Sequence, residues 1–152
     1  MSDRRRPNFF AVASALALLL AACGEKVVTP GPDVRVDGAW VRAVAGSDAN
    51  TAAYMVLRNA GSAPDRLTGA QSAAARATEL HRTTIDEAGL ARMGKVEALD
   101  LLAGGSVVME PGGFHFMLMG MTRTLSEGDT VRLMLDFEAT GTVEVTAEVR
   151  AF

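Results

Sequence analysis

The chain has 152 residues, of which 49% are hydrophobic and 22% are charged, so one domain with an ordinary buried core is expected. This composition argues against disorder and against a coiled coil. The formal net charge is −3, and no basic run follows the first six residues, which argues against a nucleic-acid-binding protein.

The N-terminal residues have the pattern of a targeting segment. Arg4, Arg5 and Arg6 precede a 14-residue apolar run from Phe9 to Ala22. A membrane-spanning helix needs about 20 such residues, so the run fits a signal peptide, expected at residues 1–22. It ends in LAACG, which resembles a bacterial lipobox whose cysteine, here Cys23, is lipidated. The alternative is an ordinary secretory signal followed by a chance cysteine.

Residues 23–34 are expected to form a lipid-anchored tether, because Pro30, Gly31 and Pro32 interrupt regular structure, and the folded domain is expected at 35–152. Lipidation would place the protein in the periplasm on a membrane, and Gly24 after the cysteine favours the outer membrane. Cys23 is the only cysteine, so the domain has no disulfide and must rely on its core.

From Val36 onward, short apolar or alternating segments are separated by turns that contain glycine. Only Gln71 to Ala77 could form a helical turn. The predicted strands include residues 39–42, 53–57, 106–109, 131–137 and 142–149. This pattern predicts an all-β domain, a sandwich or barrel, and excludes a doubly wound α/β fold.

The segment FHFMLM, residues 114–119, carries an unusual alternation. Side chains alternate across a strand, so Phe114, Phe116 and Leu118 would share one face, which is typical of a core. His115, Met117 and Met119 would share the other face, with Met121 beyond. Imidazole and thioether groups together form a soft donor set that favours Cu(I). The alternative is a histidine at a polar edge beside methionines that only fill gaps.

The second histidine strengthens the metal hypothesis. His81 and Met93 flank the turn-like segment Asp86 to Gly89, and a hairpin there would place them roughly opposite each other. Both histidines of the chain would then be paired with methionines. Glu79 would share the strand face of His81 and could orient its imidazole, although a solvated carboxylate is the expectation.

With these four residues, the sequence resembles the periplasmic copper chaperones of the PCu(A)C type. Their signature is His or Met, ten residues, Met, twenty-one residues, and His-x-Met. Here 21 residues separate Met93 from His115, and His115-Phe116-Met117 closes the motif. The resemblance spans nearly all of the mature domain, including AWVRA (39–43), AAYMVLRNAG (52–61), DRLTGA (65–70), ELH (79–81), PGGFHFMLMG (111–120) and LSEGDTVRLMLDFE (125–138).

The resemblance implies a cupredoxin-like Greek-key β-sandwich that binds one Cu(I) through His81, Met93, His115 and Met117. It also implies delivery of Cu(I) to the CuA centre in subunit II of cytochrome c oxidase, together with a Sco-type thiol protein. One departure matters: 11 residues, not ten, separate His81 from Met93. The extra residue either lengthens the turn and leaves both ligands in place, or slips the register and turns Met93 to the opposite face.

The sequence also bears on functions other than copper delivery. A blue-copper electron carrier needs a Cys thiolate, which the mature domain lacks apart from Cys23. No nucleophile–base set or phosphate loop is visible, so no enzyme is expected, although a copper redox enzyme would be a further hypothesis. The main alternative is a metal-free β-sandwich that serves as an interaction or assembly module of the cell envelope. Met119 is expected to pack at the rim and Met121 in the core.

Overall fold

The computed structural model describes residues 31–151, and these form ten β-strands without a helix. The predicted all-β fold is confirmed. The predicted signal peptide, Cys23 and most of the tether lie outside the described residues. The strands are β1 (Val34–Arg42), β2 (Thr51–Asn59), β3 (Asp65–Gln71), β4 (Ala75–Ile85), β5 (Ala91–Lys95), β6 (Leu99–Leu101), β7 (Ser106–Met109), β8 (Phe114–Met121), β9 (Thr130–Phe137) and β10 (Gly141–Arg150). Within residues 31–151, no helix is long and apolar enough to cross a membrane.

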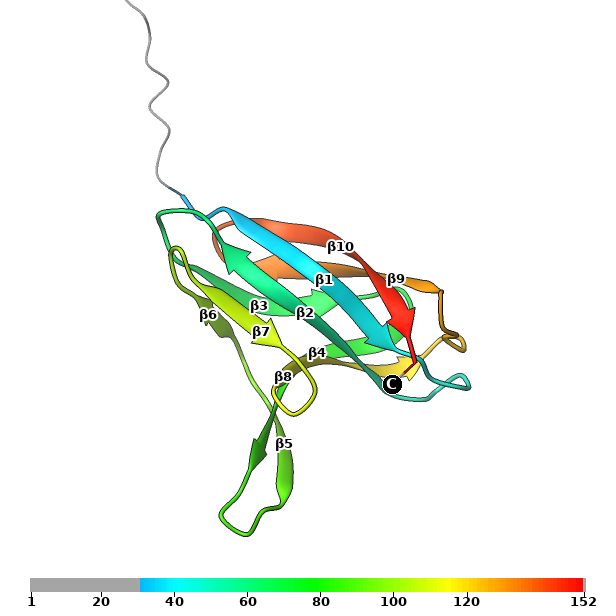
Figure 1. The fold of residues 1–152 in the computed structure, drawn as a ribbon. Coiled ribbons are helices and arrows are strands. Elements are labelled where there is room, and N and C mark those ends of the chain that lie inside the picture. Colours follow the sequence, from blue (N-terminus) through cyan, green and yellow to red (C-terminus); the bar gives the residue numbers. More distant parts are fainter. Residues whose placement is uncertain (1–30, 152) are drawn as a thin grey trace, which may run out of the picture.

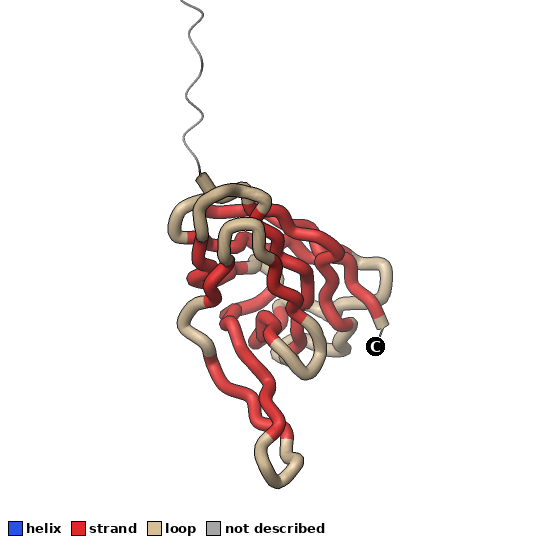
Figure 2. Tube along the Cα trace, turned by 60° about the vertical axis from the view of Figure 1, so that its left-hand side comes forward, coloured by secondary structure: helices blue, strands red, loops and turns tan. Residues whose placement is uncertain are grey.

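The strands form one hydrogen-bonded sheet in the order β5-β4-β8-β7-β2-β1-β10-β9-β3-β6, and β8 also pairs with the first half of β2. The sheet is rolled, so that β3 and β4 come into contact although they are not hydrogen-bonded neighbours. Figure 1 and Figure 2 show the strands wrapping around one interior, while the β4–β5 hairpin extends beyond it. Rolling lets one sheet enclose a core on its inner face.

The core follows from alternation along the strands, because every second side chain points inward. Its largest fully buried side chains are Phe116, Met55, Leu57, Leu67, Leu101, Leu118, Met121, Leu125, Leu133, Leu135, Val41 and Val131. These side chains come from both halves of the rolled sheet, and burial of this kind is the dominant favourable contribution to folding.

The helical turn considered for Gln71 to Ala77 is wrong. β3 runs to Gln71 and β4 begins at Ala75, so only a tight turn separates the two strands. The Ser72 hydroxyl accepts a hydrogen bond from the backbone amide of Ala74, and the Ser72 carbonyl accepts one from the backbone amide of Ala75. The alanine-rich composition favours a helix, but pairing of the flanking strands overrides that local preference.

Asn59 is a buried polar side chain that connects the segment before β1, the β2–β3 loop and strand β6. Its Oδ1 accepts the backbone amide protons of Asp33 and Gly61, each at 3.0 Å. Its Nδ2 donates to the carbonyls of Ala63, at 2.8 Å, and Leu101, at 3.3 Å. All the strong hydrogen-bonding atoms of the side chain are therefore engaged, as burial requires.

The chain enters the domain beside this network. Ala60 donates its amide proton to the Asp33 carbonyl, and Ser62 donates to the Gly31 carbonyl. A Cβ at residue 61 would collide with that carbonyl oxygen, so Gly61 is required for the close approach. The two views place this end of the domain opposite the β4–β5 hairpin (Figures 1 and 2).

Asp65 is a buried carboxylate that fixes the β9–β10 turn. It accepts hydrogen bonds from the amides of Arg66, Ala139 and Thr140 and from the Thr140 hydroxyl. Burial alone would raise the pKa of Asp65, but these hydrogen bonds outweigh it and hold the pKa below its usual value.

Candidate metal centre

Strand β8 carries core residues and candidate ligands on opposite faces. Phe116 and Leu118 are fully buried in the core. Phe114 is only partly buried, and its ring lies 5.0 Å from the Arg82 guanidinium. His115 and Met117 lie on the outer face, yet His115 is only 3% exposed. The predicted alternation therefore holds, with a buried imidazole on the outer side of the sheet.

The register between β4 and β8 brings the two histidines together. His81 lies directly opposite His115, and Glu79 lies opposite Met117. The two imidazole centroids are 5.9 Å apart with their planes at 68°. Directly opposed residues of an antiparallel pair share a face, so all four side chains belong to one outer surface.

Met93 reaches the same surface from the β4–β5 hairpin. It lies opposite Thr83, whereas His81 lies opposite Lys95, so Met93 is diagonal to His81 rather than directly across from it. The pairing is regular, and the loop between Ile85 and Ala91 takes up the extra residue. Met93 therefore keeps the face of His81, and it is 53% exposed.

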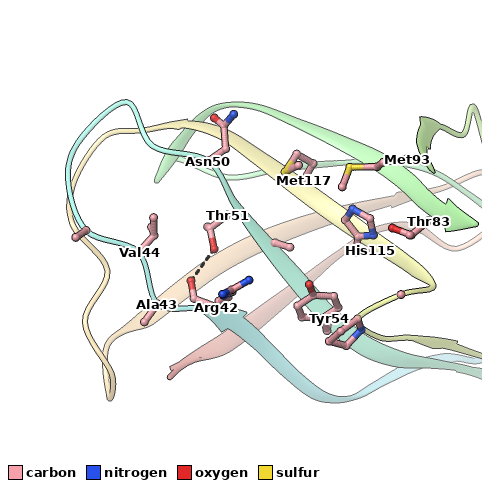
Figure 3. Close-up of a pocket in the computed structure, with 14 residues that line it drawn as sticks. Arg42, Ala43, Val44, Asn50, Thr51, Tyr54, Thr83, Met93, His115 and Met117 are labelled. Atoms are coloured by element: carbon pink, nitrogen blue, oxygen red, sulfur yellow. Dashed lines mark hydrogen bonds between the residues drawn. The ribbon is translucent and has the colours of Figure 1, made fainter. Parts of the chain in front are cut away.

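Three of the four predicted ligands line one pocket of about 510 Å³. Met93, His115 and Met117 share this pocket with Tyr54 and Thr83. Figure 3 shows Met93, Met117 and His115 pointing toward one another from β5 and β8. His81 is not part of the lining; it lies beside the His115 ring with its side chain 14% exposed.

Hydrogen bonding determines which nitrogen of His115 is available. Nδ1 lies 3.1 Å from the Gly113 carbonyl, which can only accept, so Nδ1 carries the proton. The Nε2 atom then holds the free lone pair. Burial lowers the pKa of His115, the Gly113 carbonyl opposes this, and His81 lowers the pKa further. The lowered pKa of His115 favours the neutral imidazole, which is the form that metal binding requires.

His81 has a different set of partners. Its Nε2 lies 3.0 Å from Oε2 of Glu79, while Nδ1 is buried and has no hydrogen-bond partner among residues 31–151. The other carboxylate oxygen lies 3.7 Å from Nζ of Lys95. The hydrogen bond from His81, aided by Lys95 and opposed by burial, lowers the pKa of Glu79. The expectation of a merely solvated Glu79 is therefore wrong.

Aromatic rings border the site on β1 and β2. The buried Tyr54 ring lies 6.2 Å from His115, and the Trp40 ring lies 4.6 Å from Tyr54. The sequence does not show that Trp40 lies opposite Tyr54, because this pairing depends on a bulge in β1 between Asp37 and Trp40 that shifts the register of β1 against β2. Thr51 donates to the Arg42 carbonyl at 2.6 Å, at another part of the pocket wall (Figure 3).

The remaining methionines of β8 do not join the pocket. Met121 is fully buried in the core, as expected. Met119 lies on the outer face opposite Ala77, partly exposed and outside the pocket lining. Within residues 31–151, no three His, Cys, Asp or Glu side chains form a metal-binding group; the donors gathered here are imidazoles and thioethers.

Comparison with protein families and sequences gives two matches. The family model described as "Putative lipoprotein LpqE-like" matches residues 34–149. The protein "Putative lipoprotein Lxx21020" of Leifsonia xyli subsp. xyli is 33% identical over 146 residues, which cover 91% of this chain and 87% of that protein.

Solved structures are also similar. The copper-bound PCuAC domain from PmoF2 has a TM-score of 0.66 and 28% identity, covering 82% of this chain and 97% of that one. The solution structure of CuI-DR1885 from Deinococcus radiodurans has a TM-score of 0.62 and 34% identity, covering 85% of each chain. The apo PCuAC domain from PmoF1, at 23% identity and a TM-score of 0.68, adds similarity in fold alone.

Proposed function

The chain belongs to the LpqE-like lipoprotein family, and on this basis we propose that its domain binds one Cu(I) and hands it to other proteins outside the cytoplasm. The proposed ligands are His81, Met93, His115 and Met117. The observation that carries the proposal is that three of them line one pocket while His81 lies directly opposite His115. Copper is cargo here, so the proposed role includes no catalytic step.

The donor chemistry supports Cu(I) over other metals. Thioether sulfur is a soft ligand that binds Zn²⁺, Mg²⁺ and Ca²⁺ poorly. All four donors are neutral when His81 and His115 are unprotonated, so bound Cu(I) would keep its positive charge. Met93 is half exposed on the hairpin, which would let an acceptor replace one ligand at a time.

The acceptor that fits best is the CuA centre in subunit II of cytochrome c oxidase, with a Sco-type thiol protein acting in the same delivery. This part of the proposal is supported by the resemblance of the signature ending in His115-Phe116-Met117. We further propose that Cys23 is lipidated and holds the protein on the periplasmic side of a membrane, with the outer membrane favoured.

A second candidate function has one observation in its favour. The hairpin exposes Ile85, Leu90 and Met93, at 65%, 58% and 53%. Exposed apolar side chains grouped on one element can form a protein-binding surface. A metal-free interaction module of the cell envelope would use this hairpin without any copper.

A Cu(I) titration separates the two functions. The purified protein is titrated under reducing conditions against a chromophoric chelator, beside His115→Ala, Met93→Leu and Met117→Leu. Met119→Leu is the matched control, because Met119 shares the strand and face of Met117 but lies outside the pocket.

We expect one copper per chain, loss of binding in His115→Ala, weaker binding in both pocket methionine variants, and no change in Met119→Leu. A wild-type protein that cannot take copper from even a weak chelator would contradict the proposal and favour the interaction module. Transfer of the bound copper to a soluble CuA domain then tests the proposed acceptor.

A further inference from the structure

We propose that Glu79 is a positioning residue that selects the metal-binding nitrogen of His81. By accepting a hydrogen bond from Nε2–H, it keeps the proton on that nitrogen and leaves Nδ1 as the nitrogen that His81 offers to copper, whereas His115 offers Nε2. This inference rests on the proposed copper-binding function and adds a residue to which the ligand signature assigns no role.

The first observation is the pair of environments around the His81 ring. Nε2 lies 3.0 Å from a carboxylate oxygen of Glu79. An ionised carboxylate only accepts hydrogen bonds, so Nε2 must carry the proton and Nδ1 must hold the lone pair. Nδ1 is buried and has no hydrogen-bond partner in the described part of the chain. A buried lone pair without a donor is unfavourable, and a metal ion would satisfy it.

The second observation is that His115 has the opposite arrangement. Its Nδ1 bonds to the Gly113 carbonyl, so its lone pair is on Nε2. The two rings oppose each other across β4 and β8 with centroids 5.9 Å apart. One histidine would therefore bind through the nitrogen next to its Cβ and the other through the far nitrogen. This difference lets two side chains that start from opposed backbone positions share one ion.

The third observation concerns how Glu79 is itself held. It lies opposite Met117 on β8, and its second oxygen lies 3.7 Å from Nζ of Lys95 on β5. Lys95 in turn lies opposite His81 in the hairpin. The carboxylate is thus constrained between a donor on its own strand and a cation on the neighbouring strand. Oxygen is a hard donor that suits Cu(I) poorly, so orienting His81 fits Glu79 better than ligation.

The test reads the protonated nitrogen of each histidine by long-range ¹H–¹⁵N correlation of the imidazoles. In the copper-free wild type, we expect the proton of His81 on Nε2 and that of His115 on Nδ1. With one equivalent of Cu(I), the resonance that shifts most should be Nδ1 for His81 and Nε2 for His115. This measurement needs no substitution, so it does not depend on any variant folding.

Three variants then test the role of the carboxylate. Glu79→Ala should weaken Cu(I) binding by about 10–100-fold, the usual effect of removing a partner that orients a ligand. Glu79→Gln retains an acceptor oxygen and should restore most of the affinity. Lys95→Ala removes the cation but leaves the acceptor, and should bind nearly as tightly as wild type. Thermal unfolding of each variant checks that the fold is kept.

Three results would overturn the inference: a His81 proton on Nδ1 in the copper-free protein, copper on Nε2 of His81, or tighter copper binding by Glu79→Ala. The last result would mean that Glu79 competes with copper instead of orienting the ring. If the wild type binds no Cu(I), the proposed function fails, while the copper-free spectrum still shows which nitrogen of His81 carries the proton beside Glu79.

Discussion

Two neighbouring residues of β8 offer a direct test of the division between core and site. Phe116 is fully buried and lies opposite Leu80 on β4 and Ala53 on β2. Truncation of a buried Phe to Ala costs about 3–5 kcal/mol, a large part of the roughly 5–15 kcal/mol that stabilises a typical domain. Met117 lies half-buried on the other face, and Leu nearly preserves its volume. Met117→Leu should cost less than about 1.5 kcal/mol.

Urea unfolding followed by far-ultraviolet circular dichroism, with and without Cu(I), measures both effects. Phe116→Ala should unfold at much lower urea, yet copper at 100 times the Kd should still stabilise it by about 2.7 kcal/mol, as in wild type. Met117→Leu should unfold near the wild-type midpoint and gain much less from the same copper concentration.

The reasoning would be refuted if the two substitutions had similar effects on the copper-free protein. It would also be refuted if copper stabilised Met117→Leu as much as wild type, because Met117 would then contribute no ligand.

Three further predictions concern the buried polar residues Asn59 and Asp65 and the glycine that contacts residues 31–33. Asn59→Asp keeps the acceptor oxygen but loses the donor to the carbonyls of Ala63 and Leu101. The free energy of unfolding in urea should fall by about 1–3 kcal/mol for each carbonyl left unpaired, and an unchanged unfolding midpoint would contradict this. The lowered pKa of Asp65 supplies stability that is full above about pH 4, the usual value for an unfolded Asp, and is lost as pH falls through the folded pKa. The difference in free energy of unfolding between wild type and Asp65→Asn should therefore become smaller below pH 4. A difference that stays constant with pH would show that the hydrogen bonds do not lower the pKa of Asp65. Gly61→Ala should speed amide hydrogen exchange in the N-terminal segment that Gly61 contacts, and unchanged exchange there would show that the segment adjusts without cost.

The sequence was sufficient to predict an all-β domain, most of its strands and the shared face of His115 and Met117, but it did not identify β3 and β6 as strands. Period-two alternation identified Phe116 as core and placed His115 with Met117, because each prediction depends only on local geometry. Met93 lies two cross-strand pairs away from the predicted position opposite His81, since the sequence does not show how many residues the Asp86–Leu90 loop leaves unpaired.

The sequence allowed Glu79 to orient His81, but it could not decide between that role and a solvated carboxylate. Its spacing of two from His81 predicts a shared face, but solvent would be an adequate partner for a carboxylate on an open strand. Only the hairpin register places Lys95 beside it, and only the β4–β8 register buries His81 against His115. These are long-range pairings, which local patterns do not specify.

The N-terminal segment and the β4–β5 hairpin lie at opposite ends of the domain, and this affects how the site would be presented. Residues 31–33 are fastened by Asn59 and Gly61 at one pole, and the hairpin that carries Met93 extends from the other (Figure 1). In a domain attached to a surface through its N-terminal segment, the hairpin would therefore lie at the end of the fold that is remote from the attached end. The thioether of Met93 would be presented to molecules that approach from the aqueous side, and the body of the domain would act as a spacer between that encounter and the anchor.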